Sequence, residues 1–286
     1  MSAYVISTIN LKGGVGKTTI TVALAEILAE HFRKRVLVVD LDPQTNATAM
    51  LVGEEKWRDL NAAGHTLARL FQDALQDDSS QHRFDLGASI QRGASNVQDV
   101  RTLDLLPSSL DLIDLQDRLV TMPSGRFFSN NPVEVLRRAL APVLDEYDYV
   151  LIDCPPNMGL ITLNGLRISD GYMIPTIPDV LSTYGIPQIV TRVSDFARTI
   201  GEAIRPLGIV VSKYQSNSRL HGRTLEIMRS DTSRYPHVFE TIVAQANAVA
   251  ESAEFTPVTT LRQKYGYGGR YDVFQNLAAE VMEAVQ

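Results

Sequence analysis

Residues 4–19 read YVISTINLKGGVGKTT, and this stretch decides the fold. An apolar run over 4–9 predicts a strand, and the glycine-rich loop after it ends where Lys17 opens a helical pattern. Apolar side chains then recur at the spacing of one helix face: Ile20, Ala23, Leu24, Ile27 and Leu28. A strand, a short glycine-rich loop and an amphipathic helix in this order predict the first βα unit of an α/β protein.

Short apolar runs recur along the chain and alternate with helical patterns. The predicted strands cover 4–9, 36–40, 103–106, 149–153, 172–175 and 207–211. Most of these runs are continuously apolar, which is typical of strands buried on both faces of a parallel sheet. The alternation predicts an α/β fold with a doubly wound, mostly parallel sheet flanked by helices. We expect one domain over 1–286, with a helical and loop elaboration around 53–100.

The composition excludes several other classes of protein. The chain has 286 residues, a formal net charge of −6 and a single cysteine, so a disulfide framework is excluded. No apolar run reaches the roughly 18 residues of a membrane span, and the N-terminus lacks the charged and apolar regions of a signal peptide. We expect a soluble, cytoplasmic protein.

The loop after the first strand has the features of a polyphosphate site. Gly13, Gly14 and Gly16 let the backbone approach phosphates, and the helix that follows adds the partial positive charge of its N-terminus. Lys17 is expected to reach the β- and γ-phosphates, and the Thr18 hydroxyl is expected to bind Mg²⁺. The pattern departs from G-x-x-x-x-G-K-[ST] because position 11 is leucine. The predicted binding residues are Lys12, Gly13, Gly14, Val15, Gly16, Lys17, Thr18 and Thr19.

Three motifs in this order resemble the ParA family of deviant Walker-type ATPases. They are the loop at 12–19, the segment VDLDPQ at 39–44 and the strand end LIDCPP at 151–156. Further likeness at 106–108 and 238–242 extends the resemblance over nearly the whole chain. It implies a P-loop NTPase fold of the deviant Walker type, with ATP and Mg²⁺ as cofactors. It also implies an ATPase activity that is slow without a partner protein.

The resemblance also implies roles for individual charged residues. Lys12 is expected to cross a dimer interface and contact the nucleotide of the partner subunit, where a second cation would offset phosphate charge. Asp42 is expected to position the attacking water and help hold Mg²⁺ through water, with Asp40 supporting the same site. Asp153 ends an apolar run, as a Walker B carboxylate does, and is expected to act on Mg²⁺ without binding it directly, through the groups that coordinate the ion. Alternatively, Asp40 and Asp42 form a strand end and a turn cap.

Two further pairs of residues are candidates for ligand contacts. Lys213 and Tyr214 follow a predicted strand where nucleotide-binding relatives place contacts to the base, although core packing or DNA contact would also account for them. Between 190 and 236, eight Lys or Arg residues stand against four Asp or Glu. Arg219 and Arg223 lie four residues apart on a predicted helix and are the candidate DNA contacts; a solvated charged face is the alternative.

ParA proteins bind DNA nonspecifically as ATP dimers. The resemblance therefore implies that the chain forms a homodimer with ATP, that the dimer binds double-stranded DNA, and that a ParB-like or other adaptor stimulates hydrolysis. The expected location is the nucleoid, and the cargo is a plasmid, a chromosome or a protein organelle such as a carboxysome. The alternative is a MinD-like membrane-associated spatial regulator. Residues 276–286 hold acidic residues and no Lys or Arg, which argues against membrane binding. A cluster that bridges two subunits needs two cysteines from each, so the single cysteine argues against an iron–sulfur reductase. Because the predicted first strand starts at residue 4, we expect no N-terminal helix-turn-helix and no specific operator binding.

Overall fold

The computed structural model describes residues 3–76, 83–120, 131–245, 252–267 and 269–286. Within them, seven strands form one sheet in the order β3-β2-β4-β1-β5-β6-β7, and every neighbouring pair is parallel. The strands are β1 Tyr4–Thr8, β2 Val36–Asp40, β3 Leu103–Leu106, β4 Tyr149–Asp153, β5 Gly171–Thr176, β6 Arg205–Tyr214 and β7 Val238–Ala244. The predicted α/β fold is therefore confirmed, and β7 is a strand that the sequence analysis did not predict.

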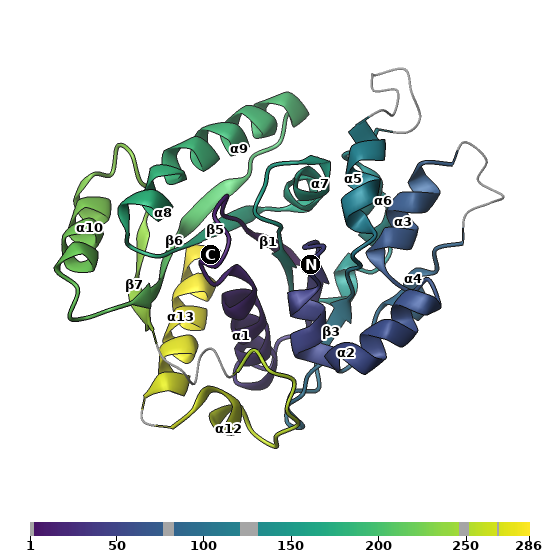
Figure 1. Cartoon of the computed structure of the whole chain (residues 1–286), viewed down its shortest axis with the longest axis horizontal. Helices are drawn as coiled ribbons and strands as arrows, with labels where there is room; N and C mark the ends of the chain where they lie inside the picture. The colour runs from purple at the N-terminus through teal and green to yellow at the C-terminus, as the bar shows by residue number, and fades with distance from the viewer. Residues whose placement is uncertain (1–2, 77–82, 121–130, 246–251, 268) are drawn as a thin grey trace.

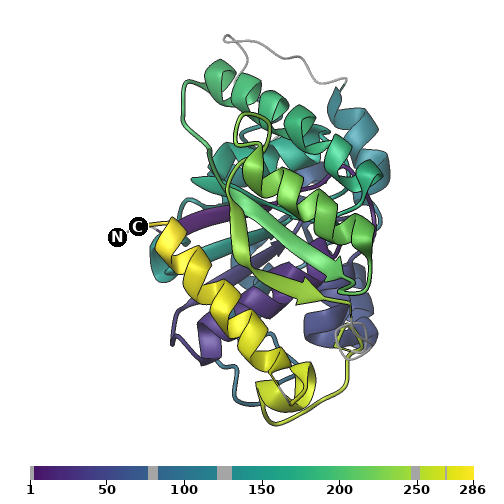
Figure 2. The same ribbon diagram turned by 90° about the vertical axis from the view of Figure 1, so that its left-hand side faces the viewer.

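Helices cover both faces of this sheet (Figure 1). One face packs against α3 Leu67–Ala74, α5 Leu112–Val120, α6 Val135–Leu140, α7 Leu160–Ile168, α9 Ile186–Ile200 and α10 Arg219–Ser230. The other face packs against α1 Lys17–Glu30, α2 Asn46–Ala62, α12 Leu261–Tyr265 and α13 Arg270–Ala284. The short helices α4 Leu86–Ser89 and α8 Val180–Tyr184 lie in connections. Figure 2 shows α13 and α1 on one side of the sheet and α9 and α10 on the other.

The carboxyl ends of three central strands meet at one edge of the sheet. Asp153 at the end of β4 stands in register with Thr8 of β1 and with Asp40 of β2. The glycine-rich loop leaves β1 at this edge and leads into α1. In open α/β sheets, ligands bind outside the carboxyl ends of the strands, so this edge is where a functional site is expected.

Candidate functional site

The glycine-rich loop has a backbone that needs glycine. Gly14 and Gly16 have φ values of 75° and 86°, in the left-handed region that other residues rarely adopt. A Cβ atom added at Gly13 or Gly14 would meet no heavy atom within 4 Å, so the space beside the loop is open. Helix α1 begins at Lys17 with no side-chain cap on its first amides. These uncapped amides, at the positive end of the helix, are suited to bind an anion.

A cavity of about 310 Å³ lies against this loop. The predicted residues that line it are Gly13, Gly14, Gly16, Lys17, Thr18, Thr19, Asp42 and Lys213. Val15 is fully buried, and its carbonyl accepts a hydrogen bond of 2.6 Å from Ser212 Oγ. The structure therefore brings most of the predicted phosphate loop together with Asp42, although about 25 residues of chain separate them.

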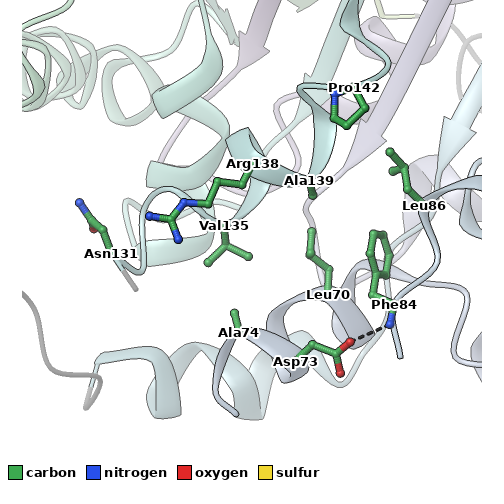
Figure 3. A pocket seen from close by; sticks show the side chains of 10 residues that line it. All are labelled: Leu70, Asp73, Ala74, Phe84, Leu86, Asn131, Val135, Arg138, Ala139 and Pro142. Atoms are coloured by element: carbon green, nitrogen blue, oxygen red, sulfur yellow. Dashed lines mark hydrogen bonds between the residues drawn. The ribbon is translucent and has the colours of Figure 1, made fainter. Parts of the chain in front are cut away.

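A second, larger cavity of about 420 Å³ lies between α3 and α6 (Figure 3). Its lining is mostly apolar, and the charged side chains in it are Asp73 and Arg138. The Asp73 carboxylate is already occupied, because its Oδ2 accepts a hydrogen bond of 2.7 Å from the Phe84 amide and its Oδ1 lies 2.9 Å from Nη2 of Arg69. The smaller cavity has the lysine and the helix N-terminus that a phosphate requires, so we assign the chemistry to the smaller cavity.

Thr18 and Asp153 meet beneath the phosphate loop. The Thr18 hydroxyl donates a hydrogen bond of 2.7 Å to Oδ2 of Asp153. The other carboxylate oxygen, Oδ1, is buried and has no hydrogen-bond partner among the described residues. Burial, and secondarily the charge of Asp40, raise the pKa of Asp153 well above its usual value.

These two residues fit a magnesium ion. Mg²⁺ is commonly held by one or two oxygen ligands of the protein, several waters and the phosphates of a substrate. Thr18 supplies a hydroxyl, and the unpaired oxygen of Asp153 can accept a hydrogen bond from a metal-bound water. A cation would also offset the cost of a buried negative charge on Asp153.

Asp40 is fully buried and holds the turn that follows β2. Its Oδ2 accepts hydrogen bonds from the amide and the hydroxyl of Thr48, at 2.8 and 2.7 Å, and its Oδ1 accepts one of 3.1 Å from the Asp42 amide. Burial raises the pKa of Asp40 to about 7 in spite of these bonds. These contacts give Asp40 a supporting position next to Asp42, which itself lines the cavity.

Lys12 does not line the cavity in this single chain. Its Nζ lies 2.8 Å from Ser182 Oγ and 3.3 Å from Oδ2 of Asp179, at the start of α8. Burial alone would raise the pKa of Asp179, but hydrogen bonds from Ser182 and Lys12 outweigh it and lower that pKa. In this single chain, Lys12 is therefore held by two residues at the start of α8.

The two candidate contacts to the base are placed differently. Lys213 has a φ of 49° and lines the cavity. Tyr214 is not among the lining residues, and its ring centroid lies 5.9 Å from that of His221 on α10. Sequence reasoning missed lining residues that α2 and the C-terminal segment supply, namely Asn46, Ala49, Met50 and Ala253. The position of Asn46 shortly after the DLDPQ motif was the available signal for α2.

Arg219 and Arg223 occupy the first turns of α10, and both are exposed. Ser218 caps this helix by accepting a hydrogen bond from the His221 amide. Further along α10, Arg229 is neutralised by an ion pair of 2.9 Å with Glu240. Within the described part of the chain, no ion pair is found for Arg219 or Arg223, so both guanidinium groups are available to an anionic partner.

Known proteins resemble this chain over most of its length. Residues 3–205 match a family model described as an AAA domain. The chain is 30% identical over 279 residues to the sporulation initiation inhibitor protein Soj of Bacillus subtilis, which covers 97% of both chains. It is also 30% identical over 246 residues to the chromosome partitioning protein ParA of Myxococcus xanthus, which covers 86% of this chain and 77% of that protein.

A solved structure shares the fold. Cobyrinic acid a,c-diamide synthase from Mycobacterium smegmatis, solved with an ATP analogue and magnesium, superposes with a TM-score of 0.71 at 24% identity. The match covers 98% of this chain and 95% of the synthase. None of the helices in the described residues is both long and apolar enough to cross a membrane.

Proposed function

The chain belongs to the ParA family of P-loop ATPases, and from that premise we propose that it is a Mg²⁺-dependent ATPase that positions a cargo on DNA. The proposed cycle has an ATP-bound dimer that binds duplex DNA nonspecifically and an adaptor protein that stimulates hydrolysis. The observation that carries the proposal is the cavity in which the phosphate loop, Thr18 and Asp42 meet above Asp153. Phosphate release measured with and without duplex DNA and Mg²⁺ tests the enzymatic part.

The residues in and beneath the cavity have separate proposed roles in ATP hydrolysis. The amides of the loop and Lys17 hold the phosphates, while bound Mg²⁺ would neutralise charge on the β- and γ-phosphate oxygens. Thr18 and Asp153 would hold that ion. Asp42 lies on the cavity wall, where its carboxylate can orient a water and accept its proton. This arrangement supplies positioning and charge stabilisation, which phosphoryl transfer chiefly requires.

An exposed apolar patch next to Lys12 supports a dimer. Val180, Leu181 and Tyr184 of α8 are 62%, 79% and 69% exposed, although large apolar side chains are usually covered. Helix α8 also carries Ser182, which together with Asp179 contacts Lys12. We propose that a second subunit packs over this face, covers the patch and places its nucleotide next to Lys12.

Lys12→Ala is expected to keep nucleotide binding to the monomer and to lose ATP-induced dimerisation. The proposed contact of Lys12 is with the nucleotide of the partner subunit, whereas Lys17 lines the cavity of its own subunit. Light scattering with Mg²⁺ and ATP measures the result, and Lys56→Ala, which removes an exposed lysine of α2, is the control. The cross-subunit role is wrong if the Lys12 variant dimerises as readily as wild type.

The proposed DNA surface includes Arg219 and Arg223 on α10. A monomer of net charge −6 would approach DNA weakly, but a dimer presents each contact twice, so DNA affinity should depend on ATP. Phosphate contacts carry no sequence information, which would make this binding nonspecific. We propose that the protein is cytoplasmic and associated with the nucleoid, and that its cargo is a plasmid, a chromosome or a protein organelle such as a carboxysome.

Replacing both Arg219 and Arg223 by Ala is expected to flatten the salt dependence of DNA binding. Each lost phosphate contact lowers the slope of log affinity against log salt by about 0.9, so up to four contacts in a dimer give about 3 to 4. Fluorescence anisotropy of labelled random DNA with ATP, with ADP and without nucleotide measures this slope. The control replaces Arg33 and Arg58, which removes the same charge elsewhere. A wild-type slope in the α10 variant would reject this surface.

A further inference from the structure

The turn that carries Asp42 has a strained backbone. Thr45 has a φ of 58°, in the left-handed region that is unfavourable for a β-branched residue. Within the turn, the Thr45 amide donates a hydrogen bond of 2.9 Å to the Asp42 carbonyl, and the Gln44 amide donates one of 3.0 Å to Oδ1 of Asp42. Strained backbone of this kind persists where the surroundings hold it in place.

Ser108 holds this turn from a different strand. Ser108 follows β3 and is fully buried, and its hydroxyl donates a hydrogen bond of 2.8 Å to the same Asp42 carbonyl. The Ser108 amide donates a second bond of 3.1 Å to Oγ1 of Thr48, which in turn donates to Asp40. The loop after β3 is thus tied at two points to the segment after β2 that presents Asp42.

Trp57 joins the same network from the second half of α2. Its indole N–H donates a hydrogen bond of 3.2 Å to the Ser108 carbonyl, and the ring is partly buried. Trp57 is the single tryptophan of the chain. Its fluorescence therefore reports on the residue that contacts the Asp42 turn, with no background from other indoles.

We propose that Ser108 is a positioning residue for Asp42, and that its hydroxyl fixes the turn so that the Asp42 carboxylate faces the nucleotide cavity. This inference rests on the proposed ATPase function. A hydrogen bond to the Asp42 carbonyl limits rotation about the Cα–C bond of Asp42. It therefore limits movement of the Cα atom that carries the side chain. A displacement of about 1 Å at a reacting group can lower a rate by about 10²-fold. If loss of the Ser108 bond displaces Asp42 by part of this distance, the fall in the hydrolysis rate is large enough to measure.

Ser108→Ala and Ser109→Ala form a matched pair for the test. Ser109 is the next residue and is also fully buried, but its hydroxyl accepts a hydrogen bond of 3.1 Å from the Asp111 amide. Ser108→Ala is expected to lower kcat by about 10-fold, within the range for a misplaced group, and to leave ATP affinity within about twofold. Ser109→Ala should leave both within about twofold. Ser108→Cys retains a weak donor and should give an intermediate kcat.

A readout without ATP separates this inference from the proposed function. In nucleotide-free protein, the amides of Gln44 and Thr45 should exchange with solvent faster in Ser108→Ala than in Ser109→Ala, and Trp57 emission should shift only in Ser108→Ala. Equal exchange and equal kcat in the two variants would overturn the role of Ser108. If Asp42→Ala retains full turnover, the proposed catalytic role of Asp42 fails, while the exchange rates still decide whether Ser108 holds the turn.

Discussion

Lys17→Ala is expected to weaken ATP binding by about 30-fold or more. Lys17 is 6% exposed and lines the cavity next to the first amides of α1. Removing one partner of a buried charge pair costs about 2 to 5 kcal/mol, and each 1.4 kcal/mol is a factor of ten in affinity. Titration calorimetry with ATP and Mg²⁺ measures the loss.

The control for this variant is Lys56→Ala, because Lys56 is exposed on α2 and should contribute little to the cavity. Both variants lose one positive charge, so a general electrostatic effect would appear in both. An unchanged ATP affinity in the Lys17 variant would contradict the assignment of the phosphate loop.

Asp42→Ala is expected to bind ATP and dimerise but to hydrolyse ATP about 10²- to 10⁴-fold more slowly, the range for loss of a general base. The side chain lines the cavity, and the bonds to Asp40 and Ser108 use the Asp42 backbone, which alanine keeps. Of the bonds named for the turn, alanine removes the one from the Gln44 amide. Removing the carboxylate should therefore slow the chemistry more than it disturbs the turn. Phosphate release under single-turnover conditions measures the rate of the chemical step.

Asp59→Ala, at an exposed position of α2, is the control for the loss of one negative charge. Turnover of the Asp42 variant within about twofold of wild type, far below the range for a general base, would reassign Asp42 to the capping of its turn. Loss of ATP binding in the Asp42 variant would instead place this residue among the groups that hold the nucleotide.

The parts of the fold that could be predicted follow from local sequence patterns. Six strands are short apolar runs because they are buried on both faces, and the phosphate loop is identified by its glycines and lysines. Strand β7 was missed because it lies at the sheet edge and its burial is mixed. The amides of Glu240 and Thr241 in β7 donate hydrogen bonds to the Glu280 carboxylate of α13. No local sequence pattern indicates this contact.

The site was predictable where its residues follow strand ends and not where distant segments meet. The motifs and the family resemblance placed Thr18 and Asp153 at one magnesium site, and the structure brings them together because β1 and β4 are neighbours in the sheet. The contact of Lys12 with Asp179 joins segments 167 residues apart. The bond from Ser108 to Asp42 depends in the same way on the pairing of β3 with β2, which the chain order does not fix.

The central claim is that ATP, bound and hydrolysed in the cavity beside Asp42, switches the protein between monomer and dimer. Light scattering of the wild-type protein with Mg²⁺ and ATP, with ADP and without nucleotide tests it most directly. We predict a mass near 31.6 kDa with ADP or without nucleotide, and twice that mass with ATP until the ATP is consumed. The same mass in all three conditions would contradict the account.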